Sequence, residues 1–309
     1  MDKKSRILVT GAGGVLGTAL LSALRDAGYE NVCAPTHIEL DLLDKKQVLE
    51  FFGKEKPEYV FHLASVVYGL KGNDVNQWKS LTLNTEINHN VFMAIETFGV
   101  KKIFFASTVA AYPDGAKVPL REEDFFIGLP HFGEFGYAMS KRHAYAYLKL
   151  LKEKRGISFC YGTFTNIFGK NDRFNSETGH VIPSLIHKAY VASNDGHDLE
   201  VWGNANTTRD FIYADDAAQG AICAMKRLDG IVNISTGEEV SMGQVAQAVA
   251  GSFPGLKYVW NSSMPVGISK RWVCNDKLKS IGWKPEHNFD DAVLETVDWY
   301  KENVHLIRK

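Results

Sequence analysis

Short apolar runs and stretches with helical spacing alternate along the first half of the chain. The apolar runs are rich in β-branched and aromatic residues and predict buried strands at residues 6–10, 32–35, 59–64, 102–106 and 157–164. The spacing between them predicts helices at residues 18–27, 45–52, 84–98 and 137–152. Continuous apolar strands separated by helices are typical of a parallel sheet covered on both faces. The pattern therefore predicts a Rossmann-type, doubly wound α/β fold.

The alternation is lost in the second half of the chain. A polar stretch precedes an amphipathic helix predicted at residues 181–192, and short strands are predicted at 201–202, 210–213 and 231–234, the last returning to the main sheet. Residues 295–303 predict a terminal helix. We therefore expect a smaller C-terminal substrate domain that interleaves with the first. The expected boundaries are residues 1–168 and 210–236 for dinucleotide binding, and residues 169–209 and 237–309 for substrate binding.

Composition narrows the function classes. The 309 residues are 45% hydrophobic, and 35 basic against 36 acidic side chains give a net charge of -1. This balance gives no general reason to bind nucleic acid or an acidic membrane, so a polyanionic ligand needs a local basic cluster. The four cysteines lie far apart, which excludes zinc-finger spacing and favours a chain without a metal site or disulfides. Because neither a signal sequence nor a membrane-length apolar stretch is present, we expect a cytoplasmic protein.

A glycine-rich turn follows the first predicted strand. Residues 10–17 read TGAGGVLG and lead directly into a predicted helix. Glycines spaced three apart permit a tight turn, close approach of backbone amides to a pyrophosphate, and close packing of helix on strand. The turn therefore predicts a dinucleotide site at the helix N-terminus. The residues expected to contact the cofactor there are Gly11, Gly14, Val15, Leu16 and Gly17.

The end of the second predicted strand bears on the choice of cofactor. NAD-binding folds usually place Asp or Glu there to bind the ribose 2′-hydroxyl, but residues 34–37 read Ala-Pro-Thr-His. Because a carboxylate would repel a 2′-phosphate, its absence favours NADPH over NADH. Thr36 and His37 are the expected phosphate contacts, although no arginine stands beside them. The other residues expected to bind the cofactor are Asp41, Leu42, Leu63 and Ala64.

A tyrosine and a lysine suggest proton transfer. Tyr137 and Lys141 are four residues apart, so both reach one face of a helix. An ammonium near the phenol would lower its pKa from about 10 and could also hold the nicotinamide ribose. Thr108 follows a predicted strand and would orient a substrate oxygen. Tyr145 and Lys149 have the same spacing, but they lie deeper in the helix, where packing is the simpler role.

Several motifs together resemble the extended short-chain dehydrogenases/reductases, and within them the GDP-L-fucose synthase family of epimerase–reductases. The general motifs are TGAGGVLG, HLAS at 62–65, STVAAYP at 107–113 and YAMSK at 137–141. The family-specific motifs are THIELDLLD (36–44), TNIFGKNDRF (165–174), GHVIPSLIHKA (179–189), VWGNANTTRDFIYADD (201–216) and KLKSIGWKP (277–285). The resemblance implies a GDP-sugar substrate, NADPH, and a homodimer formed through the helices at 84–98 and 137–152. It also assigns catalytic roles to Thr108, Tyr137 and Lys141.

The chain departs from the family at position 110. The family reads Ser-Ser-Cys-Ile-Tyr-Pro there, and its Cys and His exchange protons at sugar C3 and C5. Here His180 is kept but Ala110 has no titratable group, and Cys160 lies on a predicted core strand. The departure predicts a C4 reductase that has lost 3,5-epimerase activity, similar to enzymes of GDP-6-deoxyheptose pathways. His180 is then either catalytic or a substrate contact.

Other functions stay open to different degrees. One alternative is a complete epimerase–reductase in which another residue replaces the missing thiol. A second is a non-catalytic NADP(H)-sensing protein, against which the Thr108, Tyr137 and Lys141 set argues. Sugar-nucleotide dehydratases carry an Asp-Glu pair where this chain has Val109 and Ala110, so dehydration is not expected. A UDP-sugar 4-epimerase is compatible with the catalytic set but is not favoured by the later motifs.

A nucleotide-sugar diphosphate requires cations. Arg209, Lys270 and Arg271 are the candidates, since guanidinium groups pair bidentately with phosphate. Their simpler roles would be an ion pair of Arg209 with Asp215 or Asp216, and a solvated pair at 270–271. The remaining candidate substrate contacts, Asn166 by resemblance and Trp202 as a stacking surface for guanine or a core residue, are completed by Val181.

Overall fold

The central sheet of the protein has six parallel strands in the order β10-β5-β4-β3-β1-β2. The computed structural model describes residues 1–68, 72, 75–175, 179–263 and 268–307. The sheet strands are β1 (Ile7–Thr10), β2 (Val32–Cys33), β3 (Tyr59–His62), β4 (Lys102–Thr108), β5 (Ser158–Phe164) and β10 (Gly230–Ile234). The prediction of a doubly wound parallel sheet is confirmed, including the return of residues 231–234 to it.

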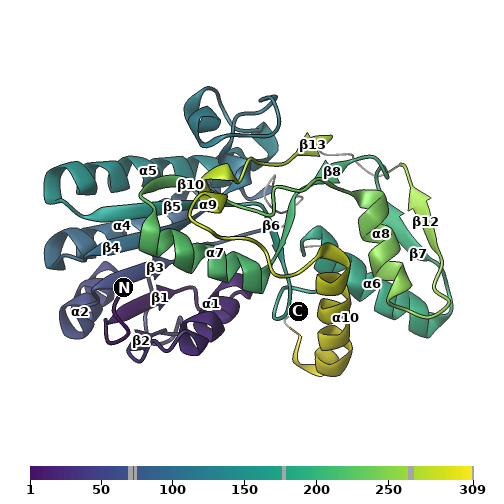
Figure 1. Ribbon diagram of the computed structural model, residues 1–309, viewed down its shortest axis with the longest axis horizontal. Helices are drawn as coiled ribbons and strands as arrows, with labels where there is room; N and C mark the ends of the chain where they lie inside the picture. Colours follow the sequence, from purple (N-terminus) through teal and green to yellow (C-terminus); the bar gives the residue numbers. More distant parts are fainter. Residues whose placement is uncertain (69–71, 73–74, 176–178, 264–267, 308–309) are drawn as a thin grey trace.

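Helices cover both faces of the sheet because its strands are apolar on both sides. On β4, Ile103 and Phe105 enter one apolar core, whereas Phe104 enters the other. The first core lies under α2 (Lys45–Glu55), α4 (Gln77–Phe98) and α5 (Phe135–Arg155), and the second lies under α1 (Val15–Asp26) and α7 (Ala214–Arg227) (Figure 1). This arrangement explains the continuous apolar runs in the sequence.

A second lobe packs beside the carboxyl end of the sheet (Figure 1). Its own apolar core lies between α6 (Val181–Asp195), α8 (Met242–Gly251) and α10 (Phe289–Asn303). Three small sheets complete it: β6 (Asn166–Phe168) with β9 (Phe211–Tyr213), β7 (Leu199–Trp202) with β12 (Tyr258–Asn261), and β8 (Thr208–Arg209) between β11 (Val240–Ser241) and β13 (Lys270–Arg271). The short helix α9 (Asp276–Lys279) contacts β10.

Two helices begin earlier than the sequence predicts. The helix α4 begins at Gln77 rather than at residue 84, and α10 begins at Phe289 rather than at residue 295. The first turn of α10 is polar, so apolar periodicity does not detect it. It is stabilised instead by the Asn288 side chain, which accepts a hydrogen bond from the backbone N–H of Asp291 at 2.9 Å.

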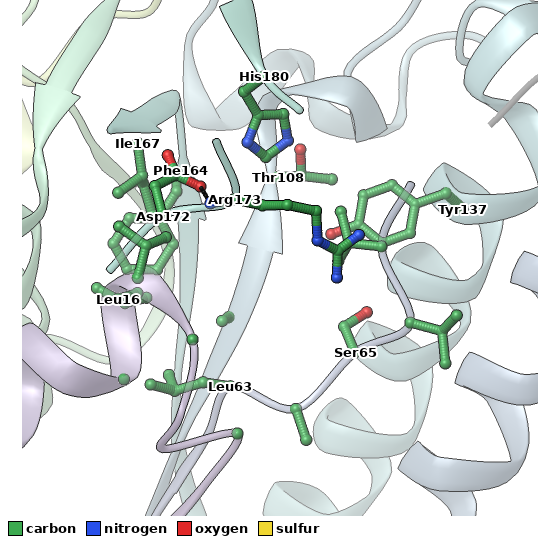
Figure 2. A pocket seen from close by; sticks show the side chains of 18 of the residues that line it. Leu16, Leu63, Ser65, Thr108, Tyr137, Phe164, Ile167, Asp172, Arg173 and His180 are labelled. Atoms are coloured by element: carbon green, nitrogen blue, oxygen red, sulfur yellow. Dashed lines mark hydrogen bonds between the residues drawn. The ribbon is translucent and has the colours of Figure 1, made fainter. Parts of the chain in front are cut away.

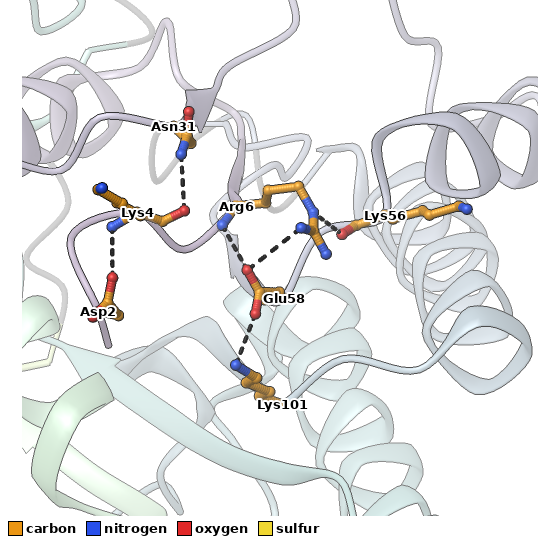
Figure 3. A network of polar contacts seen from close by, with 7 residues as sticks. All are labelled: Asp2, Lys4, Arg6, Asn31, Lys56, Glu58 and Lys101. Carbon is orange, nitrogen blue, oxygen red and sulfur yellow. Dashed lines mark hydrogen bonds and ion pairs between the residues drawn. The ribbon is translucent and has the colours of Figure 1, made fainter.

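Polar contacts join the amino ends of the strands (Figure 3). The Glu58 carboxylate accepts a hydrogen bond from the Arg6 backbone N–H at 3.0 Å and pairs with Lys101 at 2.7 Å. The Arg6 guanidinium also donates to the backbone carbonyl of Lys56 at 2.7 Å. The hydrogen bond from Lys101 lowers the pKa of Glu58. These contacts tie together the segments entering β1, β3 and β4, at the edge opposite the glycine-rich turn.

Helices α4 and α5 meet closely where both begin. The Gln77 side chain accepts a hydrogen bond from the Gly136 backbone N–H at 2.7 Å, and a Cβ at Gly136 would lie 2.1 Å from the Gln77 carbonyl oxygen. Gly136 therefore permits an approach that fixes the start of α5. Among the described residues, no helix has the length and apolar character needed to cross a bilayer.

Replacing Gly136 by alanine tests this contact. Because the added Cβ meets backbone rather than a movable side chain, we expect Gly136→Ala to lower the free energy of unfolding by about 1–3 kcal/mol, measured by urea denaturation. Gly251→Ala is the control, since a Cβ there meets nothing within 4 Å and its effect should stay within about 1 kcal/mol. Equal stability of the two variants would contradict the proposed constraint.

Candidate active site

A cavity of about 960 Å³ lies at the carboxyl edge of the sheet, between the two lobes. It is lined by residues that follow β1 to β5 and by residues of the second lobe, including those at the start of α6. Doubly wound sheets bind their ligands at this edge, where consecutive strands end together. All of the residues predicted to bind the cofactor or to act in catalysis line this cavity.

The glycine-rich turn forms one wall of the cavity. A Cβ at Gly11 would lie 2.6 Å from the Ala64 backbone nitrogen, and one at Gly17 would lie 2.3 Å from the Gly11 carbonyl oxygen. Gly11 also has a positive φ of 72°. Gly14 caps the N-terminus of α1, whose first backbone N–H groups lack partners within the helix. The turn is therefore shaped to accept the diphosphate of a dinucleotide.

The segment after β2 forms the far end of the cavity. Thr36 and His37 line it as predicted, but the expectation that no acid lies here is wrong. The Glu39 carboxylate accepts hydrogen bonds from the Thr36 backbone N–H at 2.8 Å and from the Thr36 hydroxyl at 2.9 Å. The chain turns back after Thr36, whose carbonyl accepts from the N–H groups of Glu39 and Leu40. This turn brings in an acid that the strand-end position does not reveal.

Tyr137 and Lys141 project from the first turns of α5 into the middle of the cavity (Figure 2). The Lys141 Nζ lies 5.4 Å from the centre of the Tyr137 ring and donates a hydrogen bond to the Ala106 carbonyl at 3.0 Å. The second pair is placed differently. Tyr145 packs against Phe159 and other core rings, and Lys149 forms an ion pair on the surface.

Burial changes the protonation of both side chains. It raises the pKa of Tyr137 to about 12, opposed by a hydrogen bond with Ser65, and lowers the pKa of Lys141 to about 7. The expectation that Lys141 lowers the phenol pKa is therefore not met in this structure. The physical reason is that burial disfavours the charged forms of both groups. Tyr137 consequently stays protonated at neutral pH, as a proton donor must.

Polar side chains after β3 support the tyrosine. The Ser65 hydroxyl donates to the Asn84 side-chain carbonyl at 2.8 Å, which holds Ser65 near Tyr137. His62 is buried between Thr10 and Asn88, at 2.7 and 3.0 Å, and burial lowers its pKa to about 3. Its imidazole is therefore neutral. Sequence reasoning did not select Ser65, although it ends the HLAS motif.

The loop before α6 closes the other side of the cavity. Figure 2 shows His180, Asp172 and Arg173 on this side, with the Arg173 side chain extending toward Tyr137 and Ser65. Asp172 is buried, with one oxygen accepting from the Arg173 backbone N–H at 2.7 Å and the other without a hydrogen bond to the described residues. Burial raises the pKa of Asp172, and the nearby His180 opposes the rise. Asp172 and Arg173 were missed, although the TNIFGKNDRF motif contains them.

A basic cluster lies at the mouth of the cavity. Arg209 and Arg271 both line it, and Arg271 pairs with Glu134 at 2.7 Å. Burial, and secondarily the charge of Arg271, lowers the pKa of Arg209 to about 10. Asp216 pairs with His287 at 3.1 Å rather than with Arg209. The two guanidinium groups supply the local positive charge that a nearly neutral chain needs to bind a diphosphate.

Two predicted substrate residues lie outside the cavity. Lys270 neighbours Arg271 on β13, and successive strand residues point to opposite sides, so Lys270 faces outward and pairs with Glu239 at 3.6 Å. Trp202 is 37% exposed, donates to the Glu200 carboxylate at 2.5 Å, and carries the Lys188 ammonium 3.5 Å above its ring. Neither a guanine-stacking role nor a core role agrees with this position.

Comparison with known proteins identifies the family. Residues 7–238 match the NAD dependent epimerase/dehydratase family. The chain belongs to this family. It is 32% identical to GDP-L-fucose synthase 1 of Arabidopsis thaliana, covering 98% of this chain and 95% of that protein. The predicted resemblance to extended short-chain dehydrogenases/reductases is therefore confirmed.

Two solved structures of family members show the same fold over nearly the whole chain. One is a GDP-L-fucose synthetase from Naegleria fowleri bound to NADP, with 30% identity, a TM-score of 0.92 and coverage of 100% of this chain and 98% of that chain. The other is a GDP-6-OMe-4-keto-L-xylo-heptose reductase from C. jejuni, with 27% identity, a TM-score of 0.91 and coverage of 98% and 99%.

The depressed pKa of Lys141 predicts a pH-dependent cost to stability. Between pH 7 and about 10.4 the unfolded chain binds a proton that the folded chain lacks, so the free energy of unfolding rises with pH across this window. We expect Lys141→Met to raise the melting temperature by about 2–5 °C at pH 6 and by much less at pH 9, measured by thermal denaturation without ligands. Lys149→Met on the same helix is the control. Parallel melting curves for wild type and Lys141→Met across pH would contradict the prediction.

Proposed function

We propose that the protein is an NADPH-dependent reductase that acts on C4 of a GDP-4-keto-6-deoxy sugar, a hexose or a heptose. The observation that carries the proposal is the convergence of Thr108, Tyr137 and Lys141 in one cavity with the glycine-rich turn. The names of the similar proteins, a GDP-L-fucose synthase and a keto-heptose reductase, support the substrate class. The NADP bound in one of them supports the cofactor.

The chain's own side chains perform the proton transfer in this proposal. When bound, NADPH would supply the hydride that adds to C4. Tyr137, protonated at neutral pH, donates its proton to the oxygen that becomes the C4 hydroxyl. The Thr108 hydroxyl accepts from the Ala110 backbone N–H at 3.2 Å, which leaves its own proton to orient the keto oxygen. Lys141 holds the ribose beside Tyr137.

The sugar nucleotide would lie across the opening between the lobes. Arg209 and Arg271 pair with its diphosphate, since both line the cavity. Asn166 donates its side-chain N–H to the Asp210 backbone carbonyl at 2.9 Å, so its amide oxygen is free to accept from a sugar hydroxyl. Val181 and His180 border the sugar from the start of α6. We further propose a cytoplasmic homodimer formed through α4 and α5.

The wall around Ala110 supports the loss of epimerase activity. Ala110 is buried beside Thr108 and presents a methyl group to the cavity. Among the described residues that line the cavity there is no cysteine, and burial on β5 raises the pKa of Cys160 to about 12. Inverting C3 and C5 needs an acid and a base on opposite sides of the sugar, and the thiol side is missing.

One observation favours the complete epimerase–reductase as a second candidate. Asp172 is buried next to His180, with its pKa raised, so it offers a second titratable group on the same side of the cavity. It would replace the family cysteine only if it reaches the sugar from the face opposite His180. Solvent exchange at C3 and C5 separates the two candidates.

Removing the phenol proton tests the assignment of Tyr137. We expect Tyr137→Phe to lower kcat by at least ~100-fold with GDP-4-keto-6-deoxymannose, measured as NADPH oxidation, because it removes the general acid. Cofactor binding, followed by fluorescence, should change little. Tyr145→Phe on the same helix is the matched control and should keep most of the activity. Near-normal turnover of Tyr137→Phe would reject the mechanism.

Turnover in heavy water tests the loss of epimerase activity. We expect the reduced product to carry no solvent deuterium at C3 or C5, as read by NMR and mass spectrometry, because no thiol faces the sugar. Label at either carbon would establish the second candidate instead. In that case Asp172→Asn should abolish labelling if Asp172 is the replacement group, while reduction at C4 continues.

A further inference from the structure

The adenosine end of the cavity differs in charge from the substrate end. Of the lysine and arginine residues that line the cavity, all lie among Lys141, Arg173, Arg209 and Arg271, beside the predicted catalytic residues or in the second lobe. The described lining segment after β2, residues 34–43, contributes His37 and Asp41 instead. Residues just after the second strand of such a fold face the adenosine ribose. A 2′-phosphate would therefore bind away from the arginines.

The donors that a 2′-phosphate needs are already engaged. The Thr36 backbone N–H and hydroxyl both donate to one oxygen of Glu39, at 2.8 and 2.9 Å. The backbone turn from Thr36 to Leu40 fixes this arrangement, so it does not depend on an extended side chain finding its partner. The two hydrogen bonds also lower the pKa of Glu39. The group on Thr36 is thus a carboxylate at neutral pH.

The surrounding charges oppose a second anion. The His37 Nδ1 lies 3.8 Å from an Asp41 carboxylate oxygen, so the imidazole is shared with another acid. A 2′-phosphate would have to displace Glu39 from Thr36 or lie against two carboxylates. A 2′-hydroxyl meets the opposite situation, because it can donate a hydrogen bond to a carboxylate. The same side chain therefore disfavours the phosphate and favours the hydroxyl.

We infer that Glu39 sets the cofactor preference of this protein and that the chain accepts NADH about as well as NADPH. The inference rests on the proposed function only in that the cavity binds a nicotinamide dinucleotide. It does not depend on which sugar is reduced. It makes Glu39 a specificity-determining residue, although Glu39 lies outside the strand-end position at which such residues are usually sought.

Binding of cofactor fragments tests the inference without turnover. The affinities of 5′-AMP and 2′,5′-ADP, measured by calorimetry at low salt, isolate the contribution of the 2′-phosphate. We expect the two affinities to agree within about tenfold for the wild type. Glu39→Gln, an exposed and nearly isosteric change, should tighten 2′,5′-ADP binding about fivefold or more by removing one like charge, and it should not tighten 5′-AMP binding. The gain should shrink at 0.5 M salt.

The matched control is Glu30→Gln, which removes an exposed acid at the amino end of β2 and should change neither affinity. Kinetic preference between NADH and NADPH, measured on the full reaction, should follow the fragment ratio in both variants. A wild type that binds 2′,5′-ADP more than 100-fold tighter than 5′-AMP, with a ratio unchanged by Glu39→Gln, would overturn the inference. Comparable binding of NADH and NADPH without reduction of any GDP-keto sugar would support it while rejecting the proposed function.

Discussion

The burial of the Lys141 ammonium is the constraint on which the site depends. Its Nζ donates to the Ala106 carbonyl at the end of β4 and lies over the Phe105 and Tyr137 rings. Such an environment disfavours the charge and lowers the lysine pKa to about 7. Bringing an anionic dinucleotide into the cavity would favour the ammonium again. The site is thus electrostatically incomplete in the free protein, a common compromise between stability and function.

The fold places opposite charges at the two ends of one cavity. Arg209 and Arg271 come from the second lobe, while Glu39 and Asp41 come from the loops of the sheet. Neither set reflects the net charge of the chain, which is -1. A ligand with phosphates at one end and an uncharged ribose at the other would match this distribution. The second lobe therefore contributes binding charge, whereas the sheet positions the reacting groups.

The position of Ala110 shows how a family site can keep one reaction and lose another. Reduction needs the proton donor Tyr137 and its oxygen-orienting neighbour Thr108, both present in the cavity. Epimerisation needs in addition two titratable groups flanking the sugar, because carbon-bound protons must leave and return on different faces. Exchanging a thiol for a methyl group removes one of these without disturbing β4 or α5. Reductase chemistry is therefore separable from epimerase chemistry on the same scaffold.

The sequence by itself determined the features that depend on local order along the chain. The alternation of apolar strands and helices specified the parallel sheet, and the spacing of Gly11, Gly14 and Gly17 specified the turn at its edge. The four-residue spacing of Tyr137 and Lys141 placed both on one helix face, as the structure shows. Motif order and resemblance supplied the family and located most of the cavity residues.

Only the tertiary structure decided the features that depend on distance through space and on removal from water. The burial that separates the pKa values of Tyr137 and Lys141 arises from the sheet and helix packing around them, which spacing does not reveal. The return of Glu39 to Thr36 and the outward position of Lys270 depend on the local path of the backbone. A sequence specifies which charges exist, but folding decides which of them share a cavity and which face solvent.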